Sequence, residues 1–321
     1  MNTALKIVFL GSGDIAVPIL RALTAAPQIE ISAVISQPDR PAGRKRILTP
    51  TPLAAAALEL GLDPLRIADV NTPEFLDFLN RIAPDMLCVV SFGQILKAGV
   101  LNAPKVCCVN VHASLLPAYR GASPIVQAIR NRDAQTGVCF MEMEKGLDSG
   151  AVFRTLTMPL SGNEYADALE NALGELAAAH AAETLMAIAN GTLTKQPQDP
   201  ARVSICRKIA KRDGAVNWNM HAGEIEAMSR AYYPWPGAVA QCKICGKSSA
   251  VTICSAKTVP GFNLAPGECA DMSGKLIVGC KNNSALEILE LVPSGGKRMT
   301  AAAFRNGMRG SLPEFITDEP C

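Results

Sequence analysis

Three polar side chains in the middle of the chain have the types and spacing that acyl transfer to an amine requires. Asn110 and His112 lie two residues apart at the end of an apolar run, residues 106–109. Side chains alternate between the two faces of a strand, so this amide and this imidazole emerge on the same face. Asp148 follows downstream, between two glycines. Together they offer one group to stabilise an oxyanion, one to move a proton and one to orient the imidazole.

A histidine at the end of a strand is more often structural than catalytic, so His112 needs further support. The chain has only 3 histidines, and few others compete for a catalytic role. His112 also shares its face with Asn110. The loop that follows, residues 114–121, is apolar and interrupted by Pro117 and Gly121, unlike an ordinary solvated turn. These features favour a functional site over a structural histidine.

Residues 110–121 (Asn-Val-His-Ala-Ser-Leu-Leu-Pro-Ala-Tyr-Arg-Gly) and 146–150 (Gly-Leu-Asp-Ser-Gly) resemble the folate-dependent formyltransferase family. Its members carry a catalytic Asn, His and Asp in motifs of this composition and separation, and the resemblance extends over nearly the whole chain. It implies that Asn110, His112 and Asp148 are the catalytic residues. It also implies that 10-formyltetrahydrofolate is the formyl donor and that no metal takes part.

Formyl transfer passes through a tetrahedral intermediate in which negative charge develops on the former carbonyl oxygen. Asn110 can donate its amide hydrogen to that oxygen, and His112 can donate if it is protonated. Asp148 would favour the imidazolium form electrostatically. Asp148 could also take the proton that leaves the amine, directly or through a water. The residues leave the choice between these proton paths open.

The resemblance places the folate next to two segments. The pterin ring would lie against residues 90–96 (Val-Ser-Phe-Gly-Gln-Ile-Leu), and the loop 114–117 would surround the reduced folate. At Gly93 the backbone can approach a ligand closely because no Cβ intervenes. Lys97 departs from the family, which commonly has proline there. The expected folate contacts are Val90, Phe92, Gly93, Ile95, Leu96, Ser114, Leu115, Leu116 and Pro117.

The chain of 321 residues is long enough for one large domain or two, and its composition is that of a globular enzyme with a sizeable core. The net charge of +2 excludes no class of binding partner, but the charges are unevenly distributed along the chain. Residues 1–200 carry 16 basic and 19 acidic side chains, and residues 201–321 carry 15 and 10. The more basic second part is compatible with a polyanionic partner.

The 11 cysteines do not form the spaced pairs of a secreted scaffold. Four of them, Cys88, Cys107, Cys108 and Cys139, lie in apolar runs, where cysteine acts as a small hydrophobic residue. Cys242 and Cys245 alone have ligand-like spacing, and a single pair is weak support for zinc or redox chemistry. No apolar run reaches the roughly 18 residues of a membrane span, and no secretory signal is recognisable. We expect a cytoplasmic protein.

Strands and helices alternate in the first part of the chain. Apolar patterns predict strands at 6–10, 29–35, 86–90, 106–111, 136–143 and 152–158, and helices at 15–23, 53–60 and 163–189. This order predicts an α/β fold with an open, mostly parallel, Rossmann-like sheet over residues 1–191. Residues 192–207 are polar and contain prolines, as expected of a linker.

The pattern changes in residues 208–321. A helical segment at 222–231 precedes short strand-like runs at 238–242, 250–254, 276–280 and 285–292. Short strands separated by Gly and Pro predict a small barrel or sandwich. Residues 213–218, 230–238 and 293–299 resemble the second domain of the family. The resemblance implies a smaller C-terminal β-barrel domain of the oligonucleotide-binding type.

Residues 11–16 (Gly-Ser-Gly-Asp-Ile-Ala) fit the glycine pattern of dinucleotide-binding folds, which makes an NAD(P)-dependent oxidoreductase an alternative. That function requires an acidic residue at the end of the second strand to bind the ribose. The strand at 29–35 has none, and Asp39 comes too late. The glycines are better explained by a tight turn between strand and helix.

The catalytic motif does not show which amine is formylated. A basic loop is more informative about the acceptor. Residues 37–46 carry four cations among Pro and Gly, which suits contacts with nucleic-acid phosphates. They closely resemble the loop that the methionyl-tRNA branch of the family places against the acceptor stem, with Arg44 at the position that reads its weakly paired end. The expected tRNA contacts are Arg40, Arg44, Lys45, Arg46, Lys208, Lys211, Arg212, Lys297 and Arg298.

The resemblance thus implies an enzyme that formylates the methionine amine of initiator methionyl-tRNA. We expect it to be a monomer, although the sequence does not determine the oligomeric state. Members that act on glycinamide ribonucleotide are shorter and lack the second domain. Members that act on an aminosugar nucleotide share a similar second domain and are the alternative. We expect Arg44→Ala to impair the use of tRNA while folate binding stays intact.

Overall fold

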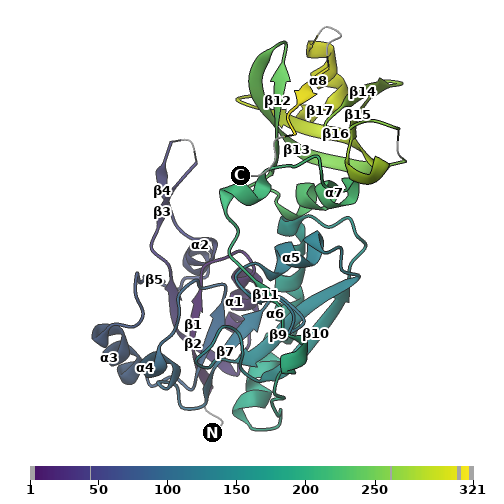
Figure 1. The fold of residues 1–321 in the computed structure, drawn as a ribbon. Coiled ribbons are helices and arrows are strands. Elements are labelled where there is room, and N and C mark those ends of the chain that lie inside the picture. Colours follow the sequence, from purple (N-terminus) through teal and green to yellow (C-terminus); the bar gives the residue numbers. More distant parts are fainter. Residues whose placement is uncertain (1–3, 44, 261, 309–311, 318–321) are drawn as a thin grey trace. The chain divides into compact units, whose positions relative to one another are not determined.

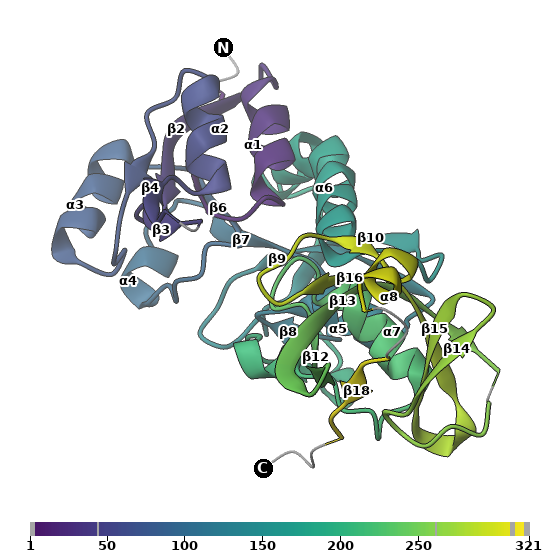
Figure 2. The same ribbon diagram turned by 90° about the horizontal axis from the view of Figure 1, so that it is seen from above.

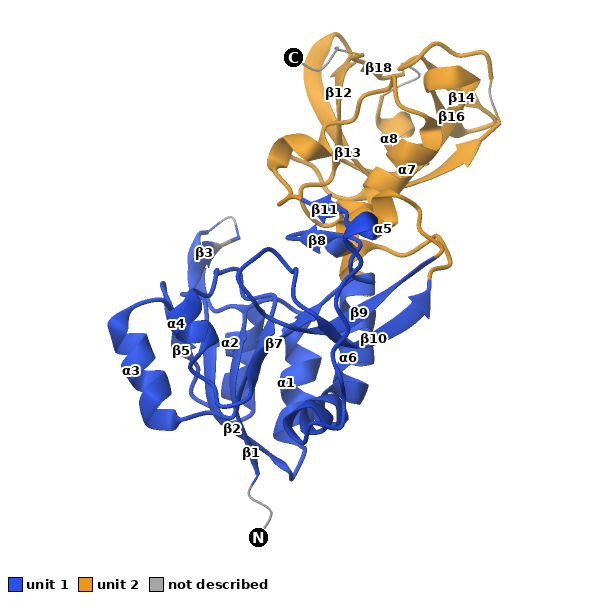
Figure 3. Cartoon of the chain, turned by 60° about the horizontal axis from the view of Figure 1, so that its bottom comes forward, with its two compact units in different colours: residues 1–124, 135–159, 169–206 blue, residues 125–134, 160–168, 207–321 orange. Residues whose placement is uncertain are grey.

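Figure 1 shows the fold in a computed structural model, which describes residues 4–43, 45–260, 262–308 and 312–317. The chain forms two compact units, drawn in different colours in Figure 3. Unit 1 consists of Met1–Pro124, Gln135–Pro159 and Leu169–Cys206, and unit 2 of Ile125–Ala134, Leu160–Ala168 and Arg207–Cys321.

Unit 1 is built around a seven-stranded sheet in the order β10-β9-β7-β6-β1-β2-β5. The strands from β7 to β5 pair in parallel, and β9 is antiparallel to both β7 and β10. This confirms the predicted mostly parallel sheet. The strands are β1 (Leu5–Gly11), β2 (Ile29–Ser36), β5 (Leu65–Arg66), β6 (Met86–Val90), β7 (Cys107–His112), β9 (Gln135–Glu142) and β10 (Val152–Pro159).

Helices pack on this sheet, and Figure 2 shows α1 (Ala16–Thr24) and α2 (Pro52–Glu59) side by side. α3 (Pro73–Ile82) buries its apolar face in a core cluster with side chains of β1 and β6, close to the short α4 (Ala98–Leu101). The predicted helix at 163–189 is α6 (Ala166–Ala189). α3 has no counterpart among the predicted elements. The sequence does mark the start of this helix. Thr72 caps it by accepting a hydrogen bond from the backbone N–H of Phe75, and a proline follows in the first turn.

The glycines of the turn after β1 are explained by close packing. A Cβ on Gly11 would lie 2.8 Å from the carbonyl oxygen of Val90, and one on Gly13 would lie 2.7 Å from Ser91 Oγ. A larger residue at Gly11 would therefore clash with the backbone of β6. This packing explains the glycines without requiring a bound dinucleotide.

Unit 2 contains an antiparallel sheet that curls into a half-barrel, in the order β14-β15-β16-β13-β12-β18 with β17 paired to β16. Trp218, the largest fully buried side chain, packs in its core with its ring 4.8 Å from that of Phe315. The strands are β12 (Ala238–Ile244), β13 (Lys247–Val259), β14 (Cys269–Met272), β15 (Lys275–Gly279), β16 (Ala285–Pro293), β17 (Met299–Thr300) and β18 (Glu314–Phe315); the helices are α5 (Pro124–Arg130), α7 (Ala222–Ala231) and α8 (Ala301–Gly307).

Two segments without predicted secondary structure contain short strands. The basic loop begins and ends in a two-stranded hairpin, β3 (Arg40–Ala42) and β4 (Ile47–Thr49). The polar segment that follows α6 ends in β11 (Ile205–Cys206), which pairs in parallel with β8 (Arg120–Gly121), the last two residues of the 110–121 motif. Within the described ranges, none of the helices combines the length and apolar character needed to cross a membrane.

Candidate active site

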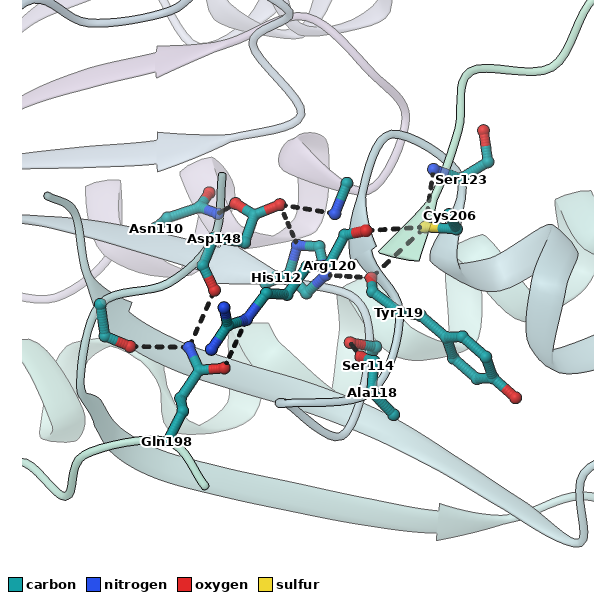
Figure 4. Close-up of polar contacts among 12 residues, drawn as sticks. Asn110, His112, Ser114, Ala118, Tyr119, Arg120, Ser123, Asp148, Gln198 and Cys206 are labelled. Atoms are coloured by element: carbon teal, nitrogen blue, oxygen red, sulfur yellow. Dashed lines mark hydrogen bonds and ion pairs between the residues drawn. The ribbon is translucent and has the colours of Figure 1, made fainter. Parts of the chain in front are cut away.

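The three predicted catalytic side chains converge where β7 ends, as Figure 4 shows. Asn110 Nδ2 donates a long hydrogen bond of 3.4 Å to Asp148 Oδ1. His112 Nδ1 lies 3.7 Å from Asp148 Oδ2. Residues 38 positions apart in the chain therefore meet around one carboxylate. The expected shared face of Asn110 and His112 is present, because both reach the same acceptor group.

The imidazole of His112 is buried, with 6% of its surface exposed, and both ring nitrogens face protein atoms. Nε2 lies 2.9 Å from the carbonyl oxygen of Tyr119. A carbonyl can only accept a hydrogen bond, so Nε2 carries a hydrogen and the neutral ring presents its bare Nδ1 to Asp148. A proton added at Nδ1 would lie against the carboxylate. This arrangement suits a proton shared by His112 and Asp148.

The backbone holds the Asp148 carboxylate in place. Asp148 itself has φ of 47°, a left-handed conformation that non-glycine residues adopt only when their surroundings enforce it. Its Oδ2 accepts a 2.8 Å hydrogen bond from the backbone N–H of Gly121. The loop enters β10 through Gly150, where a Cβ would lie 1.9 Å from the carbonyl oxygen of Glu142. The glycines of the motif thus permit the close approach that aims the carboxylate.

The loop that follows His112 is held by one hydrogen bond within the loop and one to Ser204. The buried Ser114 hydroxyl donates to the carbonyl oxygen of Ala118 at 2.6 Å, and the backbone N–H of Tyr119 donates to Ser204 Oγ at 2.9 Å. The Ser114 hydroxyl is thereby engaged within the protein. Leu115 and Leu116 are half-buried. Pro117 is buried, so the two leucines are the more accessible side chains of this loop.

The expected pterin segment divides into buried and exposed residues. The side chains of Val90, Phe92 and Leu96 are buried in unit 1. Gly93 is exposed at φ of 79° with open space beside it, and Ile95 is 84% exposed. This segment can therefore offer backbone groups and Ile95 to a ligand, while the three buried side chains anchor it in the core of unit 1.

The predicted tRNA-binding cations are exposed wherever the structure describes them. Arg40, Lys45 and Arg46 lie on the β3–β4 hairpin of unit 1, and Arg44 lies outside the described residues. In unit 2, Arg298 lies over the ring of Tyr233 and pairs with Glu290. The other exposed cations predicted there are Lys208, Lys211, Arg212 and Lys297.

Three residues that touch the site belong to the segment expected to be a linker and were not among the predicted site residues. Gln198 contacts the Asp148 loop, Ser204 holds Tyr119, and Cys206 Sγ lies 3.3 Å from the Tyr119 carbonyl oxygen. Burial is the main reason that the pKa of the Cys206 thiol is raised. These residues lie in a polar segment without periodicity, so the sequence offers no local signal for them.

Gly121→Ala is expected to damage both stability and activity. Gly121 has φ of 115°, and a Cβ there would lie 2.2 Å from the carbonyl oxygen of Cys206, so β8 must move away from β11. We expect a loss of roughly 2–4 kcal/mol in unfolding free energy, read as a lower melting temperature. Because the Asp148 contact also moves, kcat should fall about tenfold.

Gly191→Ala is the matched control for that substitution. Gly191 also has a positive φ, 69°, but nothing lies within 4 Å of its Cβ position. Alanine there should cost only about 1 kcal/mol and leave kcat unchanged. Equal effects of the two substitutions would show that backbone strain, and not the clash at β11, explains the loss.

Comparison with known proteins identifies the family. Residues 5–185 match the family model "Formyl transferase", and residues 208–309 match "Formyl transferase, C-terminal domain". A methionyl-tRNA formyltransferase of Roseiflexus sp. (strain RS-1) is 37% identical over 98% of this chain and 96% of its own length. One from Geobacter sulfurreducens is 36% identical over 95% of this chain and 94% of its own. The chain belongs to the methionyl-tRNA formyltransferase family.

Solved structures of other proteins share the fold of this family member. The N-formyltransferase from Helicobacter canadensis, solved with folinic acid and dTDP-3-aminofucose, is 18% identical with a TM-score of 0.64 over 88% of this chain and 98% of its own. HypX from Aquifex aeolicus, solved with tetrahydrofolic acid, is 16% identical with a TM-score of 0.62 over 95% of this chain and 48% of its own. At these identities the likeness supports the fold only.

Proposed function

We propose that this protein transfers the formyl group of 10-formyltetrahydrofolate to the methionine amine of initiator methionyl-tRNA, in the cytoplasm. The observation that carries this proposal is the convergence of Asn110, His112 and Asp148 at the end of β7. It occurs in a chain that matches methionyl-tRNA formyltransferases over nearly its full length. In such enzymes formylation prepares the initiator tRNA for translation initiation.

The reaction assigns a separate role to each polar group. The amine nitrogen attacks the formyl carbon, and the carbonyl oxygen becomes an oxyanion that accepts from Asn110 Nδ2. Contact with Asp148 uses only one of the two Nδ2 hydrogens. The amine proton passes to the pair formed by His112 Nδ1 and Asp148. Collapse of the intermediate then breaks the bond between the carbonyl carbon and the folate nitrogen, which takes up a proton.

The folate is proposed to bind along the two segments that flank these residues. Gly93 and Ile95 are exposed, so the 90–96 segment can present backbone groups and one apolar side chain to a flat ring. Gln94 fixes this segment: it accepts from the backbone N–H of Val70 at 3.0 Å and donates to the carbonyl oxygen of Ile67 at 2.9 Å. Leu115 and Leu116 supply the apolar side of the second segment.

The amine is tested by direct competition between substrates. Purified protein is given 10-formyltetrahydrofolate with charged initiator tRNA, charged elongator tRNA or an aminosugar nucleotide. We expect rapid formylation of the initiator only. Preferential formylation of the aminosugar nucleotide would replace the proposed function by the alternative, and no formylation of any acceptor would contradict both.

The basic hairpin is expected to bind tRNA through phosphates. Replacing Arg40, Lys45 and Arg46 together by alanine should raise KM for tRNA about tenfold or more at physiological salt and leave folate binding unchanged. The dependence of tRNA affinity on salt should become shallower, because each lost phosphate contact removes about 0.7–0.9 from its logarithmic slope. Both are measured by titration at several salt concentrations.

Arg81→Ala is the control for charge alone, since Arg81 is an exposed cation on α3. It should leave the salt slope unchanged. A triple variant that keeps the full slope would show that the hairpin is not part of the tRNA interface.

We also propose that Lys208, Lys211, Arg212, Lys297 and Arg298 contact the tRNA backbone. The domain of residues 208–321 is proposed to act together with a catalytic domain of residues 1–191.

A further inference from the structure

The side chain of Gln198 makes three hydrogen bonds to the two segments that hold the catalytic residues (Figure 4). Its Nε2 donates to the carbonyl oxygen of Asp148 at 2.8 Å and to that of Gly150 at 2.7 Å. Its Oε1 accepts from Arg120 Nε at 2.9 Å. Two carbonyls demand donors and a guanidinium demands an acceptor, so the amide can take only this orientation.

Two of these contacts are made to the strained part of the loop of residues 146–150. Asp148 is held in a left-handed conformation with φ of 47°, which the loop adopts at an energetic cost. Gln198 fixes the carbonyl of that same residue and the one two positions later. The Asp148 side chain in turn faces His112 Nδ1. Losing the two donated bonds would free the backbone that aims the carboxylate.

The third contact ties Gln198 to the other side of the site. Arg120 lies in β8, whose next residue, Gly121, donates its N–H to Asp148 Oδ2. The backbone N–H of Arg120 also donates to the carbonyl oxygen of Ser204 at 2.9 Å. Gln198 therefore joins β8 to the Asp148 loop, and each of these two segments contributes to the position of the carboxylate.

We infer that Gln198 is a positioning residue for formyl transfer, which sets the geometry of Asp148 relative to His112 through the Asp148 and Gly150 carbonyls. This inference rests on the proposed function. The side chain acts through other residues, so its loss should slow the chemical step and leave the affinity for both substrates unaffected. A purely architectural role would instead lower the amount of folded protein.

Two substitutions separate the roles of the amide. Gln198→Glu keeps an acceptor for Arg120 but offers oxygen in place of the two donated hydrogens, so the carbonyls are repelled. Gln198→Met keeps the length of the side chain without donor or acceptor. We expect both to reduce kcat roughly tenfold to a hundredfold. KM for tRNA and for the folate should each stay within about twofold of the wild type.

Gln196→Glu is the matched control, because Gln196 is an exposed residue of the same segment that bridges β10 through its backbone. It introduces the same charge two positions away and should leave kcat unchanged. Rates are normalised to folded protein, and melting temperatures are recorded for every variant. Wild-type kcat in both Gln198 variants would overturn the inference, as would losses accounted for by unfolding or by higher KM. An inactive wild type would instead contradict the proposed function.

Discussion

Asp148→Asn is expected to reduce kcat for formylation about a thousandfold. The carboxylate accepts from the backbone of Gly121 and from Asn110, and it faces His112 Nδ1. An amide keeps only one acceptor oxygen and carries no charge, so a proton at Nδ1 loses its counter-charge and the amine loses its acceptor. Loss of proton transfer alone typically costs about 10²–10⁴ in rate. The measurement is single-turnover formylation of charged initiator tRNA.

Asp63→Asn serves as the matched control for Asp148→Asn, because Asp63 is an exposed carboxylate in the segment between α2 and β5 of the same unit. It should retain wild-type turnover. Folate binding by Asp148→Asn should also stay near the wild type, which shows that the site is intact. Near-normal turnover of Asp148→Asn would refute the role of the carboxylate in proton transfer.

Asn110→Ala is expected to lower kcat by about 10²–10³, the usual cost of removing one oxyanion donor. Both nitrogens of His112 already face the Tyr119 carbonyl and Asp148, so Asn110 is the donor best placed to meet the developing charge. The loss should appear in kcat and in kcat/KM alike, because the bond forms only in the transition state. Steady-state kinetics with tRNA varied at saturating folate distinguish this from a binding defect.

Asn102→Ala controls for removal of an amide elsewhere in unit 1, since Asn102 is an exposed residue at the end of α4. It should be neutral. If Asn110→Ala raised KM for the folate and left kcat unchanged, Asn110 would be a ground-state binding residue, and another donor would have to stabilise the oxyanion.

Much of the fold follows from local patterns in the sequence. The runs that become β1, β2, β6 and β7 are apolar because both faces of a parallel sheet are covered. The alternation of strands and helices predicts the mostly parallel sheet of unit 1, and the short runs after residue 208 predict the curled sheet of unit 2. α3 escaped prediction although Thr72 and a following proline mark its start.

Local sequence is also enough to place two of the candidate catalytic side chains on one face of a strand. Asn110 and His112 are two residues apart on a strand, so the pleat alone points them the same way. The motifs around them also indicated the family, and they make residues 110–121 and 146–150 the candidate site. These features depend on neighbouring residues, and neighbours can be read directly from a sequence.

The hydrogen bonds that hold the site become visible in the three-dimensional structure. It shows that the Ser114 hydroxyl is used inside its own loop and that Phe92 faces the core. It also brings Gln198 to a carbonyl 50 residues earlier, and Ser204 to a backbone group 85 residues earlier. Such hydrogen bonds depend on the path of the chain through the whole unit. They leave no periodicity or spacing in the sequence from which they could be predicted.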